Sequence, residues 1–106
     1  MKVVVIMPTY NEGDNILLMT ETLQNEFTRV PHKMHILVVD DNSPDGTSDL
    51  VRRLMKKHDN LHLITGEKKG LGAAYIRGMT YAINELGADA VFEMDADFSH
   101  DPADIP

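Results

Sequence analysis

The sequence predicts an α/β protein in which a parallel sheet is covered by helices on both faces. Short apolar runs alternate with longer segments whose apolar residues recur at helical spacing, so four strands and three helices follow one another in turn. The runs are rich in Val and Ile, as is typical of strands buried on both faces. Polar residues follow three of the four runs, which indicates a ligand-binding edge of the sheet.

The four expected strands are apolar runs bounded by polar or turn-forming residues. They cover Lys2 to Met7, Met34 to Val39, Leu61 to Thr65 and Asp89 to Met94. Because Pro8 has no backbone N–H to donate, the first strand is expected to end before it.

Three expected helices lie between the strands, and each carries an apolar face. They cover Asp14 to Phe27, Asp49 to His58 and Gly72 to Leu86. The residues expected to face inward are Ile16, Met19, Leu23 and Phe27 in the first helix, Leu50, Val51, Leu54 and Met55 in the second, and Ala73, Ile76, Ile83 and Leu86 in the third.

Length and charge narrow the possible functions. The chain has 106 residues, enough for one small domain, and a formal net charge of −7. Such an acidic chain is not expected to bind nucleic acid or a bare anionic membrane, and without Cys it has no disulfide or thiolate metal site. No helix is expected after the fourth strand, so residues 1–106 are expected to form the N-terminal half of a single larger domain.

The polar residues cluster where strands end. Pro8 to Glu12 follow the first strand, Asp40 to Thr47 the second, and Asp95 to Asp97 the fourth. Since parallel strands share a direction, these segments are expected to meet at one edge of the sheet and to form a binding site there.

Asp95 and Asp97 form the clearest candidate for a metal site. Two carboxylates separated by one residue in extended chain point to the same side and repel each other unless a proton or a cation intervenes. Hard divalent ions such as Mg²⁺ or Mn²⁺ bind one or two carboxylates together with phosphate oxygens. Alternatively, Asp97 caps the turn and Asp95 is simply exposed.

The other strand ends allow two interpretations each. Asp40 and Asp41 are adjacent acids that could accept hydrogen bonds from a base or ribose, while Ser43 to Gly46 are typical of a helix cap and a turn. Thr9 and Glu12 match a capping box. Tyr10 is either a core residue or a stacking partner for a base.

Gly70 and Gly72 do not complete a known phosphate-binding loop. The dinucleotide fingerprint would need Gly where Tyr75 stands, and the P-loop pattern is absent. Arg77 lies near these glycines in the sequence and is a candidate phosphate contact or a surface residue.

Four blocks together resemble glycosyltransferase family two. They are PTYNE at 8–12, VVDDNSPDGT at 38–47, GLGAAYIRGM at 70–79 and MDADFSHDP at 94–102. Their order and spacing are those of the polyprenyl-phosphate glycosyltransferases, a group that includes the dolichyl-phosphate mannose synthases. The resemblance implies the GT-A fold, a Rossmann-like nucleotide-sugar-binding architecture.

The resemblance also implies roles for individual residues. Positions that contact the guanine and ribose of GDP-mannose, or hold the nucleoside, correspond to Pro8, Tyr10, Glu12, Val39 and Asp41. The D-x-D that binds the divalent ion and the diphosphate corresponds to Asp95 and Asp97, with Ala96 beneath the ribose or metal and Ser99 in the metal shell.

The implied reaction is transfer of mannose from GDP-mannose to dolichyl phosphate with inversion, giving a β-linked mannosyl phosphate lipid. The family places its acceptor-phosphate and lipid-facing residues after the D-x-D, so these 106 residues alone are expected to bind nucleotide poorly and not to catalyse the transfer. The implied location is the cytoplasmic face of a membrane, that of the endoplasmic reticulum in a eukaryote or the plasma membrane in a prokaryote.

Two alternatives remain open from the sequence. One is another family-two transferase that uses UDP-glucose or UDP-GlcNAc. The other is a phospho-receiver signalling domain, because HILVVDDN at 35–42 resembles the first strand and acidic pair of such a domain.

Overall fold

The computed structural model describes residues 1–9, 13–40, 46–66 and 71–94. The elements alternate as β1 (Lys2–Thr9), α1 (Gly13–Phe27), β2 (Lys33–Asp40), α2 (Thr47–Met55), β3 (Leu61–Thr65), α3 (Leu71–Asn84) and β4 (Ala90–Glu93). All strand pairs are parallel, and the strands lie in the order β3-β2-β1-β4. The predicted α/β class is therefore confirmed, with most boundaries shifted by one or two residues.

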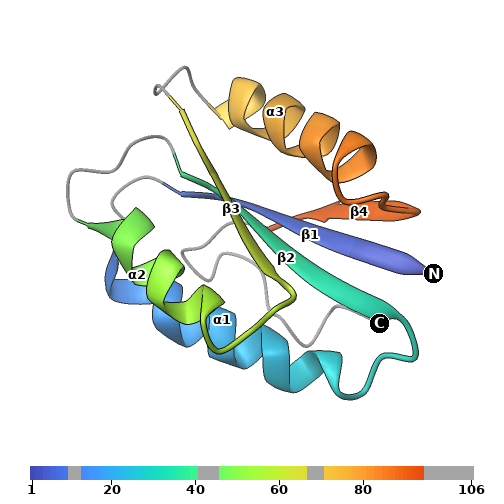
Figure 1. Ribbon diagram of the computed structural model, residues 1–106, viewed down its shortest axis with the longest axis horizontal. Coiled ribbons are helices and arrows are strands. Elements are labelled where there is room, and N and C mark those ends of the chain that lie inside the picture. The colour runs from blue at the N-terminus through green and yellow to red at the C-terminus, as the bar shows by residue number, and fades with distance from the viewer. Residues whose placement is uncertain (10–12, 41–45, 67–70, 95–106) are drawn as a thin grey trace.

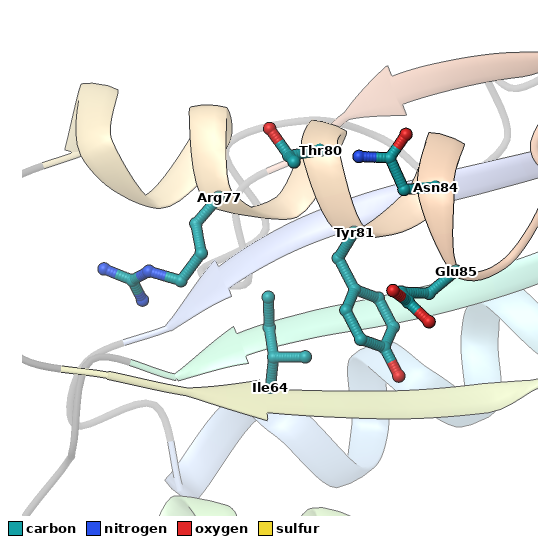
Figure 2. Close-up of a pocket in the computed structure, with 6 residues that line it drawn as sticks. All are labelled: Ile64, Arg77, Thr80, Tyr81, Asn84 and Glu85. Atoms are coloured by element: carbon teal, nitrogen blue, oxygen red, sulfur yellow. The ribbon is translucent and has the colours of Figure 1, made fainter.

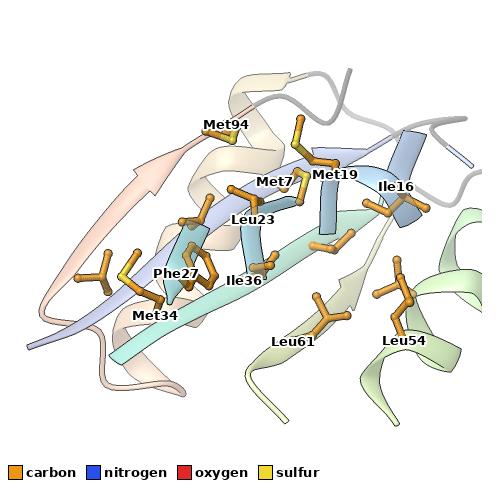
Figure 3. Close-up of a cluster of buried hydrophobic side chains, with 14 residues drawn as sticks. Met7, Ile16, Met19, Leu23, Phe27, Met34, Ile36, Leu54, Leu61 and Met94 are labelled. Atoms are coloured by element: carbon orange, nitrogen blue, oxygen red, sulfur yellow. The ribbon is translucent and has the colours of Figure 1, made fainter. Parts of the chain in front are cut away.

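The sheet lies between two helical layers. Helices α1 and α2 cover one face, and α3 covers the other (Figure 1). Alternate residues of each strand point to opposite faces, so Val3 and Val5 pack with α1 and α2 while Val4 and Ile6 pack under α3. Figure 3 shows the larger of these two clusters, in which Leu23 and Phe27 of α1 lie over the strands.

Strand β1 continues through Pro8, contrary to the prediction that it ends there. Pro8 pairs with Val39 of β2, and the next residue, Thr9, pairs with Asp40. The backbone groups of Ile6 face β4, where its carbonyl accepts a hydrogen bond from Met94 N–H at 2.9 Å. By alternation the nitrogen of Pro8 also faces that side, just past the end of β4, so its missing N–H interrupts no ladder.

Most of the predicted inward faces are correct. The expected apolar face of α1 is buried, and Val51 and Leu54 of α2 are buried as well. Met55 is instead 36% exposed, because it lies at the last position of α2.

The predicted inward face of α3 is wrong at Ile76 and Ile83, which are exposed, whereas Leu86 packs against the cluster as expected. Ala74 and Ala82 are buried in that cluster, and Gly78 faces Ile6 and Val39 of the sheet. A Cβ added to Gly78 would lie 2.7 Å from Cγ2 of Ile6, so the helix backbone lies close to the sheet. Close approach favours small residues at the centre of this face, and Tyr75, Met79 and Tyr81 pack around them, half-buried.

Candidate functional site

The carboxyl ends of the strands define the candidate site. β1 is followed along the chain by β2, which lies on one side of it, whereas β4 lies on its other side. The connection from β1 leads to β2 on one side, whereas the connection from the edge strand β3 crosses back to β4 on the other side of β1. Ligands of open α/β sheets bind outside the carboxyl ends at such a switch point. Thr9 at the end of β1 and Met94 just after β4 border this point.

The buried carboxylate of Asp40 in β2 connects three elements, because it accepts hydrogen bonds from both β1 and α2. Asp40 is 0% exposed, and its Oδ1 accepts a hydrogen bond of 2.7 Å from the hydroxyl of Thr9. Its Oδ2 accepts one of 2.6 Å from the hydroxyl of Ser48 in α2. The backbone carbonyl of Asp40 accepts a hydrogen bond from Gly66 N–H, which follows β3. We name this arrangement of Thr9, Asp40 and Ser48 the Asp40 bracket.

The bracket changes the interpretation of several strand-end residues. Thr9 is not the cap of α1, since that helix begins at Gly13 and the hydroxyl of Thr9 donates to Asp40. α2 begins at Thr47 after Gly46, whose φ of 84° is a left-handed conformation that glycine adopts readily. The predicted cap at Ser43 lies outside the described residues. The partners Thr9 and Ser48 were missed because each is 8 or more positions from Asp40 in the sequence.

Two of the predicted donor-site residues lie in the described chain. Pro8 is half-buried at the end of β1, beside the switch point. Val39 is 0% exposed and packs under α3, so a nucleoside at this position would have to contact its backbone. The other predicted site residues, Tyr10, Glu12, Asp41, Asp95, Ala96, Asp97 and Ser99, lie outside the described residues.

No cluster of metal-ligating side chains occurs within residues 1–9, 13–40, 46–66 and 71–94. The predicted ligands begin one residue after that part of the chain. At the end of the described chain, Met94 N–H donates to the carbonyl of Ile6, three residues before β1 ends at Thr9. The hard oxygen atoms of the carboxylates expected as ligands, Asp95 and Asp97, match Mg²⁺ or Mn²⁺.

A hollow of about 410 Å³ lies away from this point, between α3 and the edge strand β3. Figure 2 shows Tyr81 of α3 extending toward β3, with Glu85, which follows α3, beside it and Ile64 of β3 below the helix. Among the residues singled out from the sequence, only Arg77 lines it. A Cβ added to Gly66 would lie 2.7 Å from Nη1 of Arg77, so this guanidinium packs against the backbone just past β3.

Comparison with known proteins assigns the family. Residues 4–106 match the family described as Glycosyl transferase family 2. The chain belongs to glycosyl transferase family 2. No helix in the described part of this family member is long and apolar enough to cross a membrane.

Two curated members of glycosyl transferase family 2 match over the whole chain. An undecaprenyl-phosphate mannosyltransferase of Micrococcus luteus is 41% identical over 107 residues, covering 100% of this chain and 42% of the relative. A dolichol-phosphate mannosyltransferase of Pyrococcus furiosus is 38% identical over 106 residues, covering 100% of this chain and 28% of the relative. The chain thus spans less than half the length of either relative.

A solved structure supports the same fold. The mannosyltransferase PcManGT from Pyrobaculum calidifontis, in complex with GDP-Man and Mn²⁺, is similar with a TM-score of 0.67 and 34% sequence identity. The match covers 76% of this chain and 24% of that one. The expected GT-A type of architecture is confirmed by such neighbours.

Proposed function

We propose that this protein transfers mannose from GDP-mannose to dolichyl or another polyprenyl phosphate, with inversion at the anomeric carbon. The observation that carries the proposal is the identity of about 40% with polyprenyl- and dolichol-phosphate mannosyltransferases along the whole chain. The switch point formed by β1 and β4 supports it, because that is where a nucleotide ligand of a parallel sheet binds.

The donor would lie across the carboxyl ends of β1, β2 and β4. The guanine and ribose would be held by Pro8, Tyr10, Glu12, Val39 and Asp41, and Ala96 would lie beneath the ribose or the metal. A divalent ion is supported by the Mn²⁺ complex of PcManGT, and here Asp95, Asp97 and Ser99 would hold it. When bound, that ion supplies Lewis-acid stabilisation of the diphosphate leaving group.

The acceptor needs little activation by the protein. A lipid phosphate is anionic near neutral pH, so its oxygen is a competent nucleophile without a strong general base. The work of the chain is then to bind the donor, orient it for in-line attack and stabilise the departing charge. We place the reaction at the cytoplasmic face of a membrane, where the lipid acceptor would be available.

Calorimetric titration tests the donor assignment. GDP-mannose is titrated with and without Mn²⁺, with GDP-glucose and UDP-glucose as competing donors. We expect Mn²⁺-dependent binding that is selective for guanine nucleotides and is lost in the double variant Asp95→Ala/Asp97→Ala. The control Asp59→Ala removes an exposed carboxylate at the start of β3, at the opposite edge of the sheet, and should leave binding unchanged.

Two outcomes would overturn the proposal. Selective binding of UDP-glucose would assign the protein to another family-two transferase. If the protein binds no nucleotide sugar, the assignment of a donor site is wrong. The phospho-receiver alternative is disfavoured, because the chain belongs to glycosyl transferase family 2 and Asp40 of the acidic pair is buried.

A further inference from the structure

The Asp40 bracket links the points at which two segments leave the sheet. These segments, which follow Thr9 and Asp40, carry the predicted nucleoside contacts. Thr9 immediately precedes Tyr10, and Asp40 immediately precedes Asp41. Ser48 follows the same polar segment on its other side, at the start of α2. One carboxylate therefore fixes where the first segment leaves β1, where the second leaves β2, and where the second returns to α2.

The orientation of Asp40 follows from strand alternation. Ile36 and Val38 point toward α1 and α2, so Asp40 points the same way and lies under the first turn of α2. Val39 points to the opposite face, under α3. Of the two adjacent acids, Asp40 is thus the one directed into the protein, and a nucleoside contact is expected only of Asp41.

A contribution to stability alone does not explain why a carboxylate, that of Asp40, occupies this buried position. A buried carboxylate must give up its hydration, and hydrogen bonds inside the protein have to offset that cost. Apolar residues could join the same three elements without the desolvation cost. The carboxylate differs from them in fixing two hydroxyl groups, on different elements, at defined distances of 2.7 and 2.6 Å.

We propose that Asp40, acting through Thr9 and Ser48, is a positioning residue that sets the affinity for the guanine nucleotide of the donor. This inference rests on the proposed function. Asp40 does not touch the ligand; it holds the ends of the two nucleoside-contacting segments at the separation that binding requires. Loss of either hydroxyl would leave the fold in place but would misplace one of these ends.

Substitution of the two hydroxyls tests the bracket. Thr9→Val keeps the shape of the side chain and Ser48→Ala shortens it, while both remove a hydrogen bond to Asp40. We expect each to weaken GDP binding in the presence of Mn²⁺ by about tenfold, the effect of losing one hydrogen bond to a charged group. Thr9→Ser retains the hydroxyl and should restore affinity to within about twofold of wild type.

Controls separate positioning from stability. Ile36→Val weakens the core without touching the bracket, and Thr80→Val removes an exposed hydroxyl that donates to the carbonyl of Ile76. Both should keep wild-type GDP affinity when every variant is measured well below its unfolding midpoint. Circular dichroism at the titration temperature confirms that each variant is folded.

The outcomes distinguish this inference from the proposed function. If wild type binds GDP and folded Thr9→Val and Ser48→Ala bind it equally well, the bracket is only structural and the inference is wrong. If Ile36→Val loses as much affinity as Thr9→Val, the effect reflects stability and the inference is again wrong. If wild type binds no guanine nucleotide, both the donor assignment and the inference fall.

Discussion

Thr20 lies fully buried in α1, and its hydroxyl has no hydrogen-bond partner in the described part of the chain. A buried hydroxyl without a partner loses its hydration and gains nothing in return. Thr20→Val keeps the shape and a similar helix propensity, so we expect the free energy of unfolding to rise by about 1 kcal/mol. Urea denaturation measures the change.

Thr22→Val is the matched control for that substitution. The hydroxyl of Thr22 donates to the carbonyl of Leu18 on the exposed side of the same helix. Its removal should change the free energy of unfolding by less than about 0.5 kcal/mol. If Thr20→Val proves destabilising, the hydroxyl of Thr20 makes a contact that the structure does not record.

The sequence predicted that polar residues follow the strands, but not which of them are buried structural residues and which are available to a ligand. Asp40 and Asp41 are indistinguishable as letters, and only the register of β2 shows that Asp40 shares the side of Val38. The donors to Asp40 come from β1 and α2, so they are neighbours in space and not in sequence. Patterns of neighbouring residues in the sequence indicate turns and helix caps, but they do not show which distant residues come into contact.

Helix α3 shows where periodicity fails at the scale of an element. Its large apolar residues recur at helical spacing, and this pattern predicted an inward face that includes Ile76 and Ile83. The observed contact is set by how closely the backbone approaches Ile6 and Val39, which favours Gly and Ala. In α1, where large side chains fill a wider gap, the same reasoning was correct.

Gly78→Ala tests the close approach of α3. The added Cβ would lie 2.7 Å from Cγ2 of Ile6 and 3.0 Å from Cγ2 of Val39. Alanine has the higher helix propensity, but overpacking of a filled core outweighs that gain, so we expect a net loss of about 1–3 kcal/mol. Thermal or urea unfolding measures the loss.

Thr80→Ala on the exposed side of α3 is the control for Gly78→Ala. Thr80 is exposed, and its hydroxyl donates to the carbonyl of Ile76, so the substitution should change stability by less than about 0.5 kcal/mol. A Gly78→Ala variant that is more stable than wild type would show that α3 can move away from the sheet at little cost.

For the whole molecule, the alternation of strands and helices was sufficient to predict a parallel sheet with both faces covered. The strand order β3-β2-β1-β4 was not predicted, because it depends on which side of β1 each crossover takes. That choice nevertheless creates the switch point, and it places β4 beside β1, with Glu93 at the end of β4 paired with Ile6. The site is thus a consequence of topology as much as of motif.

The stability of the whole molecule should depend on pH through a pair of stacked histidines. His35 of β2 and His62 of β3 stack, with Nδ1 of His35 3.0 Å from Nε2 of His62. Burial, followed by the positive charge of Lys2, lowers the pKa of both imidazoles below 6.5, and His62 further lowers the pKa of His35. Asp59 opposes the shift of His35, whereas Lys33 adds to it.

The sign of the effect follows from proton linkage. Below about pH 6.5 the unfolded chain takes up protons on these histidines while the folded chain resists them. The free energy of unfolding should therefore be greatest above that pH and should fall as the pH drops toward the lowered pKa values. Protonation of the accepting ring also removes the hydrogen bond between β2 and β3.

Urea unfolding at about pH 7.5, 6.5 and 5.5 measures this dependence across the range in which histidines titrate. In His62→Gln the loss of stability on acidification should be smaller than in wild type, because one proton-linked site and the charge repulsion within the pair are both removed. His32→Gln removes an exposed histidine outside the pair and should keep the wild-type dependence. Equal stability of wild type at all three pH values would contradict the prediction, since imidazoles that resist protonation in the fold must make acidification unfavourable to it.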